Sequence, residues 1–337
     1  MFGLTVLSQA LTTAILPLAA GILAPTRFEA AWPYALTFLG AAIAAFPAAA
    51  LTDSFGRRAV AALGASLGLA GGVIAAHGFA VGRFPELALG AFWLGAAQGF
   101  GFFHRHGASS NVMEKRHAAG IVLGAGCVAA LIAPAVTIFA QNLAGPLAPA
   151  VDVMVAGTLL VAHFAVAIIP DSVDTTAKPR AQTVTPYLPR SQFVFATLAA
   201  AAAWFVMARL MAGAAPAMFF CGIGEGAASG LIANHFIWMY AAAALASPIA
   251  WRMQARTITN IGLVLIFAAL AIFQFAESPA TFVALTTLSG AGWSFAMLGA
   301  ANMLQGAIPK RSLLAVHDFT LFTAAIAGAL SGVLTNL

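Results

Sequence analysis

Runs of about 20 apolar residues recur along the whole chain, and they constrain its fold more than any other feature. A helix of that length crosses a hydrocarbon core of roughly 30 Å. The runs lack the apolar-polar alternation of an outer-membrane barrel, so we interpret them as helices. The predicted spans are residues 2–24, 33–52, 59–81, 86–103, 118–142, 150–170, 192–214, 231–250, 258–275, 280–303 and 313–335.

The composition excludes a soluble globular protein. Hydrophobic residues make up 62% of the chain, charged residues 7%, and the mean hydropathy is +0.95, whereas a soluble domain carries about 25% charged residues. The basic residues behind the net charge of +5 lie mainly in short loops, so we expect no nucleic-acid binding. No nucleophile, base and orienting group share a recognisable spacing, so we expect no enzyme. The predicted class is an all-α membrane protein surrounded by the lipid bilayer.

One long polar segment divides the spans. Residues 171–191 hold three prolines and separate six predicted spans from five. We therefore expect an N-terminal six-helix bundle at 1–170, a linker at 171–191 and a C-terminal five-helix bundle at 192–337. A weak resemblance between the ends of the second and eighth runs suggests that the two bundles are related repeats around a central site.

The distribution of basic residues predicts the orientation. Twelve of the fifteen Lys and Arg residues fall in one alternating set of loops or in the linker, which the positive-inside rule places in the cytoplasm. We therefore expect a multi-pass protein of the inner membrane with a cytoplasmic N-terminus and a cytoplasmic linker.

Two pairs of soft side chains stand on consecutive runs. Met207 and Met211 are spaced i, i+4 on one run, and His235 and Met239 repeat that spacing on the next. Each pair occupies one face of a helix. Thioether and imidazole groups together form a ligand set suited to Cu(I), although methionine is also a common filler of apolar cores. The pattern leaves a metal site and ordinary packing as alternatives.

The segment Ala50 to Val60, ALTDSFGRRAV, resembles a signature of the major facilitator superfamily. In that signature an Asp is followed by a Gly and paired basic residues on a cytoplasmic loop. The resemblance implies a two-bundle transporter that works by alternating access. It implies gating roles for Asp53, Gly56, Arg57 and Arg58, and the segment containing Arg105 and Arg116 resembles a further part of the cytoplasmic gate.

A finer resemblance is to the CcoA-like branch of that superfamily, which contains copper importers. The segments MARLM and HFIWM match its Met-x-x-x-Met and His-x-x-x-Met motifs, which makes Met207, Met211, His235 and Met239 the implied copper ligands. Copper is then a substrate, and no cofactor is expected. The family has twelve helices and this sequence shows eleven, so we expect a groove that a membrane-protein partner could cover.

Two charged residues and two other functions remain open. Arg209 lies inside a predicted span, where its charge is costly unless it meets a cavity or a partner. It is a candidate counter-charge for an anionic solute, and Asp318 is a candidate for proton coupling. Relatives in the group are thought to carry riboflavin, so a flavin transporter, with tryptophans as stacking surfaces, is the main alternative to copper import. A transport-inactive scaffold subunit is the third hypothesis.

Overall fold

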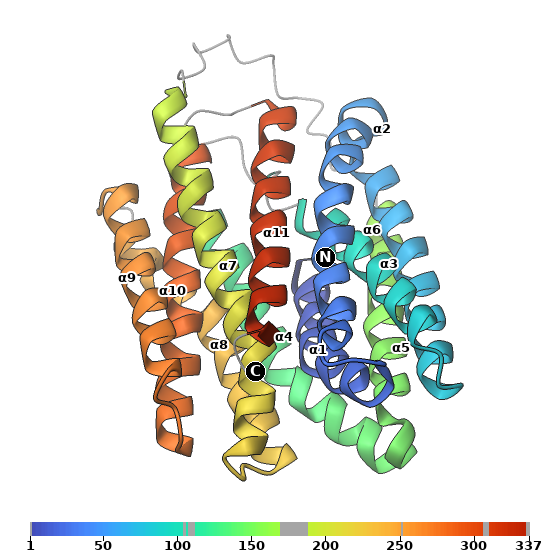
Figure 1. Ribbon diagram of the computed structural model, residues 1–337. Helices are drawn as coiled ribbons and strands as arrows, with labels where there is room; N and C mark the ends of the chain where they lie inside the picture. Colours follow the sequence, from blue (N-terminus) through green and yellow to red (C-terminus); the bar gives the residue numbers. More distant parts are fainter. Residues whose placement is uncertain are drawn as a thin grey trace.

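The structure is a computed structural model that describes residues 2–103, 106, 112–168, 188–250, 252–305 and 310–334. Within these ranges the regular structure is helical throughout (Figure 1). The elements are α1 (Phe2–Leu23), η1 (Glu29–Ala31), α2 (Trp32–Ala80), α3 (Phe84–Phe103), α4 (Val112–Ala144), η3 (Gly145–Leu147), α5 (Ala148–Val161), α6 (His163–Ile168), α7 (Arg190–Phe220), α8 (Glu225–Ala250), α9 (Ala255–Phe273), α10 (Pro279–Gln305) and α11 (Arg311–Leu334).

Helix α2 contains two of the predicted spans. It is 49 residues long, and its helical backbone is interrupted at Gly56, where φ is 76° and ψ is −179°. Residues with a side chain almost never adopt this conformation, whereas glycine does so readily. The second and third predicted spans, 33–52 and 59–81, therefore join through a sharp break and not through an open loop.

Seven helical segments in the described part of the chain are long and apolar enough to cross a membrane. Two of them exceed one crossing: Glu29–Ala80 covers 52 residues and Gly126–Ala165 covers 40. The all-α membrane fold is confirmed, while the number of eleven crossings stays a prediction.

The helices pack as two groups that meet along two long contacts. Helices α1–α6 pack mainly with one another, as do α7–α11, and the principal contacts between the groups pair α2 with α11 and α4 with α8. Figure 1 shows α9 and α10 at one side of the molecule and α3 and α5 at the other. Residues 171–187 of the predicted linker lie outside the described residues, so the domain boundaries remain predictions.

Glycines bring helix backbones into direct contact. A Cβ added to Gly157 of α5 would lie 2.5 Å from the carbonyl oxygen of Gly68 and 2.8 Å from the Cα of Gly72, both on α2. The Gly-x-x-x-Gly spacing of the third predicted span thus serves helix packing, as small residues commonly do in membranes.

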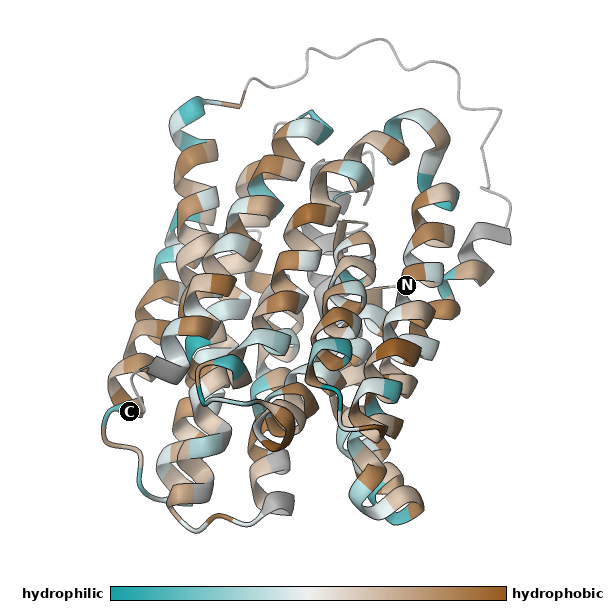
Figure 2. Cartoon of the chain, turned by 45° about the vertical axis from the view of Figure 1, so that its right-hand side comes forward, coloured by the Kyte–Doolittle hydropathy of each residue, from teal (hydrophilic) through white to brown (hydrophobic). Residues whose placement is uncertain are grey.

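The outer surface is apolar over most of its height. Figure 2 shows hydrophobic residues along the helices and the hydrophilic ones mostly near their ends. Large apolar side chains such as Leu198, Leu245 and Val264 are exposed, which suits contact with lipid. A partner protein on the second group of helices stays a prediction.

Replacing Gly157 with alanine should destabilise the α2–α5 contact. The added methyl meets backbone atoms, which cannot move aside like a flexible side chain, so we expect a cost of about 1–3 kcal/mol. Thermal unfolding of the purified protein in detergent measures it. Gly21→Ala is the matched control, since nothing lies within 4 Å of its added Cβ. Equal unfolding temperatures for the two variants would show that this contact is not tightly packed.

Candidate functional site

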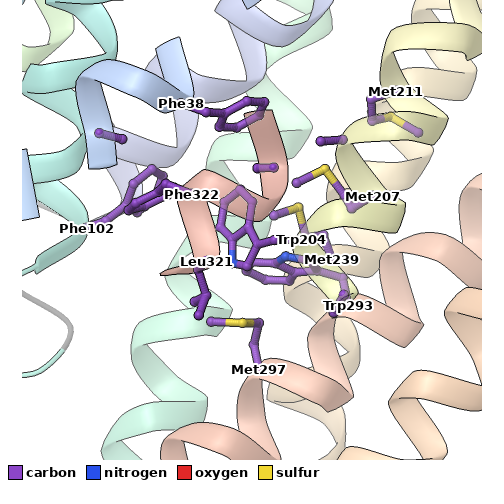
Figure 3. Packing of buried hydrophobic residues seen from close by; sticks show 14 of the residues in the cluster. Phe38, Phe102, Trp204, Met207, Met211, Met239, Trp293, Met297, Leu321 and Phe322 are labelled. Atoms are coloured by element: carbon purple, nitrogen blue, oxygen red, sulfur yellow. The ribbon is translucent and has the colours of Figure 1, made fainter. Parts of the chain in front are cut away.

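The four side chains predicted to bind a metal are all buried, on the two helices expected. Met207 and Met211 lie on α7, and His235 and Met239 on α8, each with 3% or less of its surface exposed. Figure 3 shows Met211 and Met207 one above the other, with Met239 beneath them. Convergence of all four on a common point stays a prediction.

His235 has one nitrogen engaged and one without a partner. Its Nδ1 lies 2.8 Å from the hydroxyl oxygen of Ser289 on α10, and its Nε2 has no hydrogen-bond partner in the described part of the chain. Ser289 therefore orients the ring and leaves Nε2 able to bind a ligand.

Arg209 is held away from the methionines. Its guanidinium Nη1 donates to the carbonyl oxygen of Ser331 at 3.2 Å, near the end of α11. The last carbonyls of a helix carry partial negative charge, so this contact offsets part of the cost of a cation in the membrane. This position weakens the interpretation of Arg209 as the counter-charge of an anionic solute.

An aromatic cluster lies beside the methionines, where the two groups of helices meet (Figure 3). Trp204 of α7 lies 5.3 Å from Trp293 of α10, 5.2 Å from Phe322 of α11 and 5.9 Å from Phe38 of α2, measured between ring centroids. The ring planes are steeply inclined, which is a favoured arrangement for aromatic pairs. We call Phe38, Trp204, Trp293 and Phe322 the aromatic cluster.

Two polar atoms in this cluster have no partner. The indole Nε1 atoms of Trp204 and Trp293 are buried and make no hydrogen bond within the described residues. A buried donor left unsatisfied costs about 1–3 kcal/mol. Each of these two N–H groups is therefore a donor without an acceptor among the described residues.

A polar stripe on α1 was missed in the sequence. Thr5, Ser8, Gln9, Thr12 and Thr13 are all buried although they lie on an apolar helix. The amide nitrogen of Gln98 on α3 lies 3.1 Å from the Ser8 hydroxyl and 3.2 Å from the Thr12 hydroxyl. Their helical spacing within the first apolar run was the available signal.

Tyr240 links the stripe to the aromatic cluster. Its hydroxyl donates to the side-chain oxygen of Gln9 at 3.3 Å, and its ring lies 5.9 Å from that of Trp293. Side chains from both groups of helices therefore form one continuous polar and aromatic region.

One end of the molecule carries an ion pair between the two groups. Asp53 of α2 pairs with Arg311, the first residue of α11. Both side chains are about half exposed. Arg57 and Arg58 are exposed beside the break at Gly56. We call this the charged end; it is at the top in Figure 1.

A second, buried contact lies at the charged end. The Nε2 of His106 is 3.0 Å and 3.1 Å from the two carboxylate oxygens of Asp318, whose side chain is 1% exposed. Next to it, the Nδ1 of His317 lies 3.0 Å from the Thr197 hydroxyl. Asp318 thus ties α11 to the segment after α3. Arg105 and the side chain of Arg116 lie outside the described residues.

The opposite end contains a cavity of about 590 Å³. Its lining comes from the ends of α1 and α4 and the beginnings of α5 and α8, and includes Ile15, Thr137, Gln141 and Ile232. Asp152 of α5 lies in this wall but is fully buried. Asp152 lies inside the predicted span 150–170, but sequence reasoning gave it no role.

Comparison with known proteins identifies the family. The model for the Major Facilitator Superfamily matches residues 1–332. The riboflavin transporter RfnT of Brucella anthropi is 27% identical over 327 residues, which cover 90% of this chain and 79% of the relative.

Solved structures share the fold. The human organic anion transporter MFSD10 (TETRAN) has a TM-score of 0.70 at 13% identity, covering 99% of this chain and 90% of its own. A bacterial homologue of the iron transporter ferroportin, in an outward-facing state, has a TM-score of 0.60 at 14% identity, covering 99% and 96%. The chain therefore belongs to the Major Facilitator Superfamily, and it is a membrane transporter of that type and not an enzyme.

Proposed function

We propose that this protein imports a riboflavin-like solute by alternating access. The observation that carries the proposal is the pair of unpartnered indole N–H groups in the aromatic cluster. A flavin is a planar heteroaromatic ring with carbonyl acceptors, so it could stack on aromatic side chains and accept those hydrogen bonds. The 27% identity to a riboflavin transporter supports the same substrate class.

The polar stripe of α1 suits the rest of such a solute. Riboflavin carries a chain of hydroxyl groups, and Gln9 and Thr12 lie near hydroxyl and amide partners with which they could exchange hydrogen bonds. The stripe lies in the first group of helices, and Trp204, Trp293 and Phe322 of the cluster lie in the second, so a solute bound between them would contact both halves. Such a solute could favour one arrangement of the halves over another, as alternating access requires.

The contacts at the two ends suggest the direction. The charged end is held by Asp53–Arg311 and His106–Asp318, while the cavity occupies the other end. We infer that the charged end faces the cytoplasm, in keeping with the positive-inside rule, and that this conformation faces outward in the inner membrane. Import then requires both contacts to break.

Copper import is the second candidate. Three buried thioethers and the unpartnered Nε2 of His235 support it, because these are soft ligands for Cu(I). The contact between Arg209 and Ser331 keeps that cation bonded to a carbonyl on α11. Comparing riboflavin and copper uptake in the same proteoliposomes distinguishes the two substrates.

Replacing either indole donor should weaken flavin binding. Trp204→Phe and Trp293→Phe keep an aromatic ring but remove the N–H, so we expect the KM for riboflavin to rise about 2- to 10-fold for each. Each substitution also removes buried ring volume, which lowers thermal stability, and the loss of an unsatisfied buried donor offsets part of that cost. Trp32→Phe, at a half-exposed position outside the cluster, is the control. An unchanged KM in both cluster variants would argue against contact between the indoles and the solute.

Methionine variants test the copper alternative. Met207→Leu keeps the volume but removes the thioether, so it should abolish copper uptake if Met207 is a ligand. Met297→Leu, another buried methionine, should then retain it. Isotope uptake into proteoliposomes measures both variants. Equal copper uptake by the two would exclude Met207 as a ligand, and riboflavin uptake in the same vesicles checks that both variants are folded.

The two ion pairs at the charged end should contribute unequally. Asp53 and Arg311 are half exposed, so a double-mutant cycle of Asp53→Asn and Arg311→Gln should give a coupling of about 0.2–1 kcal/mol. Asp318→Asn should open the charged end much further, since removing one member of a buried pair costs about 3–5 kcal/mol.

Distances between spin labels on α2 and α11 report this opening. Leu63 and Val316 are exposed positions suitable for labels, in a background where Cys127 and Cys221 are replaced by serine. If the label distance increases more in Asp53→Asn than in Asp318→Asn, the Asp53–Arg311 contact contributes more to holding the charged end closed, contrary to the prediction.

A further inference from the structure

Asp152 is a buried acid that none of the contacts described so far employs. It lies on α5 in the wall of the cavity, between Thr137 and Gln141 of α4 and the end of α1. Its exposed surface is 0%, and neither carboxyl oxygen has a hydrogen-bond partner in the described part of the chain. An isolated carboxylate is far more costly in such a place than a neutral carboxylic acid.

Beside Asp152, α5 also packs against an apolar cluster. Its neighbour Val153 belongs to a buried cluster with Ile15 and Leu16 of α1 and Ala76 of α2. None of these side chains can donate a hydrogen bond or supply a compensating charge. The environment therefore favours the protonated acid while the cavity wall is closed over it.

The helices around Asp152 differ in their ionisable groups. Helix α1 has none, and α5 has no other. His77 of α2 is exposed, and its Nδ1 is 2.7 Å from Glu86 of α3, which also pairs with Arg83. On α6, His163 is 3.4 Å from the Thr5 hydroxyl, and on α8, His235 contacts Ser289. The other ionisable residues of these helices are Tyr34, Asp53, Arg57, Arg58, Glu114, Lys115, Arg116, His117, Cys127, Glu225 and Tyr240.

We propose that Asp152 is the proton-binding site that couples solute import to a proton gradient. A proton entering from the cavity adds to one carboxylate oxygen and gives the neutral acid, which the apolar wall can enclose. Ionisation restores the charge and requires water, so it needs the wall to open or the proton to leave on the other side. Proton uptake and closure of the cavity are thereby linked, and proton and solute move in the same direction.

Asp318, the acid expected from the sequence to serve coupling, is differently placed. Its carboxylate already has His106 as a partner at 3.0 Å. That pairing suits a contact that holds the charged end closed. Asp152, in contrast, adjoins the cavity through which a proton would enter.

The proposal rests on the proposed flavin transport, and Asp152→Asn tests it. Asparagine copies the shape of the neutral acid but cannot exchange a proton. In proteoliposomes, a gradient of one pH unit should let the wild type accumulate riboflavin up to about tenfold for one coupled proton. The variant should only equilibrate riboflavin, with a ratio near one, while still exchanging labelled for unlabelled riboflavin. Glu29→Gln removes an exposed carboxylate from the turn after α1 and should behave as the wild type.

A second measurement separates this proposal from the choice of substrate. Infrared spectra of the wild type and of Asp152→Asn, both without solute, are subtracted from one another. The wild type should show the carbonyl band of a protonated carboxylic acid, and the variant should lack it. Absence of that band in the wild type, or full gradient-driven accumulation in the variant, would overturn the proposal. If wild-type protein does not move riboflavin at all, the proposed substrate is wrong, and the infrared spectra still decide whether Asp152 binds a proton.

Discussion

The bilayer interior has no water to solvate a polar group, and this constraint organises the whole molecule. Most buried polar side chains form hydrogen bonds with other groups of the protein. Gln98 bonds to Ser8 and Thr12, and Arg209 bonds to a helix carbonyl. The two indole N–H groups and Asp152 are among the exceptions in the described part of the chain. In a medium where an unmet polar group is costly, such exceptions are the places where a solute or a proton is expected.

The fold was predictable because membrane helices are specified by length and hydropathy, and both can be calculated directly from the sequence. The runs of apolar residues led directly to the all-α architecture. The joining of two runs into one interrupted helix was not predicted. Nothing in the segment before Arg57 distinguishes a glycine in a loop from one that breaks a helix at a single residue.

The site was predictable only in part, because a site depends on which helices become neighbours. A family resemblance singled out Asp53, but its pairing with Arg311 depends on α2 and α11 becoming neighbours. Met207 and His235 were singled out by their spacing, yet the sequence alone could not relate them to the aromatic cluster beside them. Asp152 escaped notice because its burial results from the packing of α1, α2 and α4 around α5.

The glycine contacts bear on how stiffness is distributed through the molecule. Within the first group of helices, α2 and α5 touch largely through backbone atoms at Gly72 and Gly157, and such a contact leaves little room for side chains to change rotamer. Between the groups, the aromatic cluster and the ion pairs consist of side chains that can rotate and exchange partners. Elastic compliance is therefore concentrated at the seam between two rigid blocks. The main thermal motion is then a rocking of the two groups of helices against each other. A molecule bound between the groups would stop this motion without deforming either group.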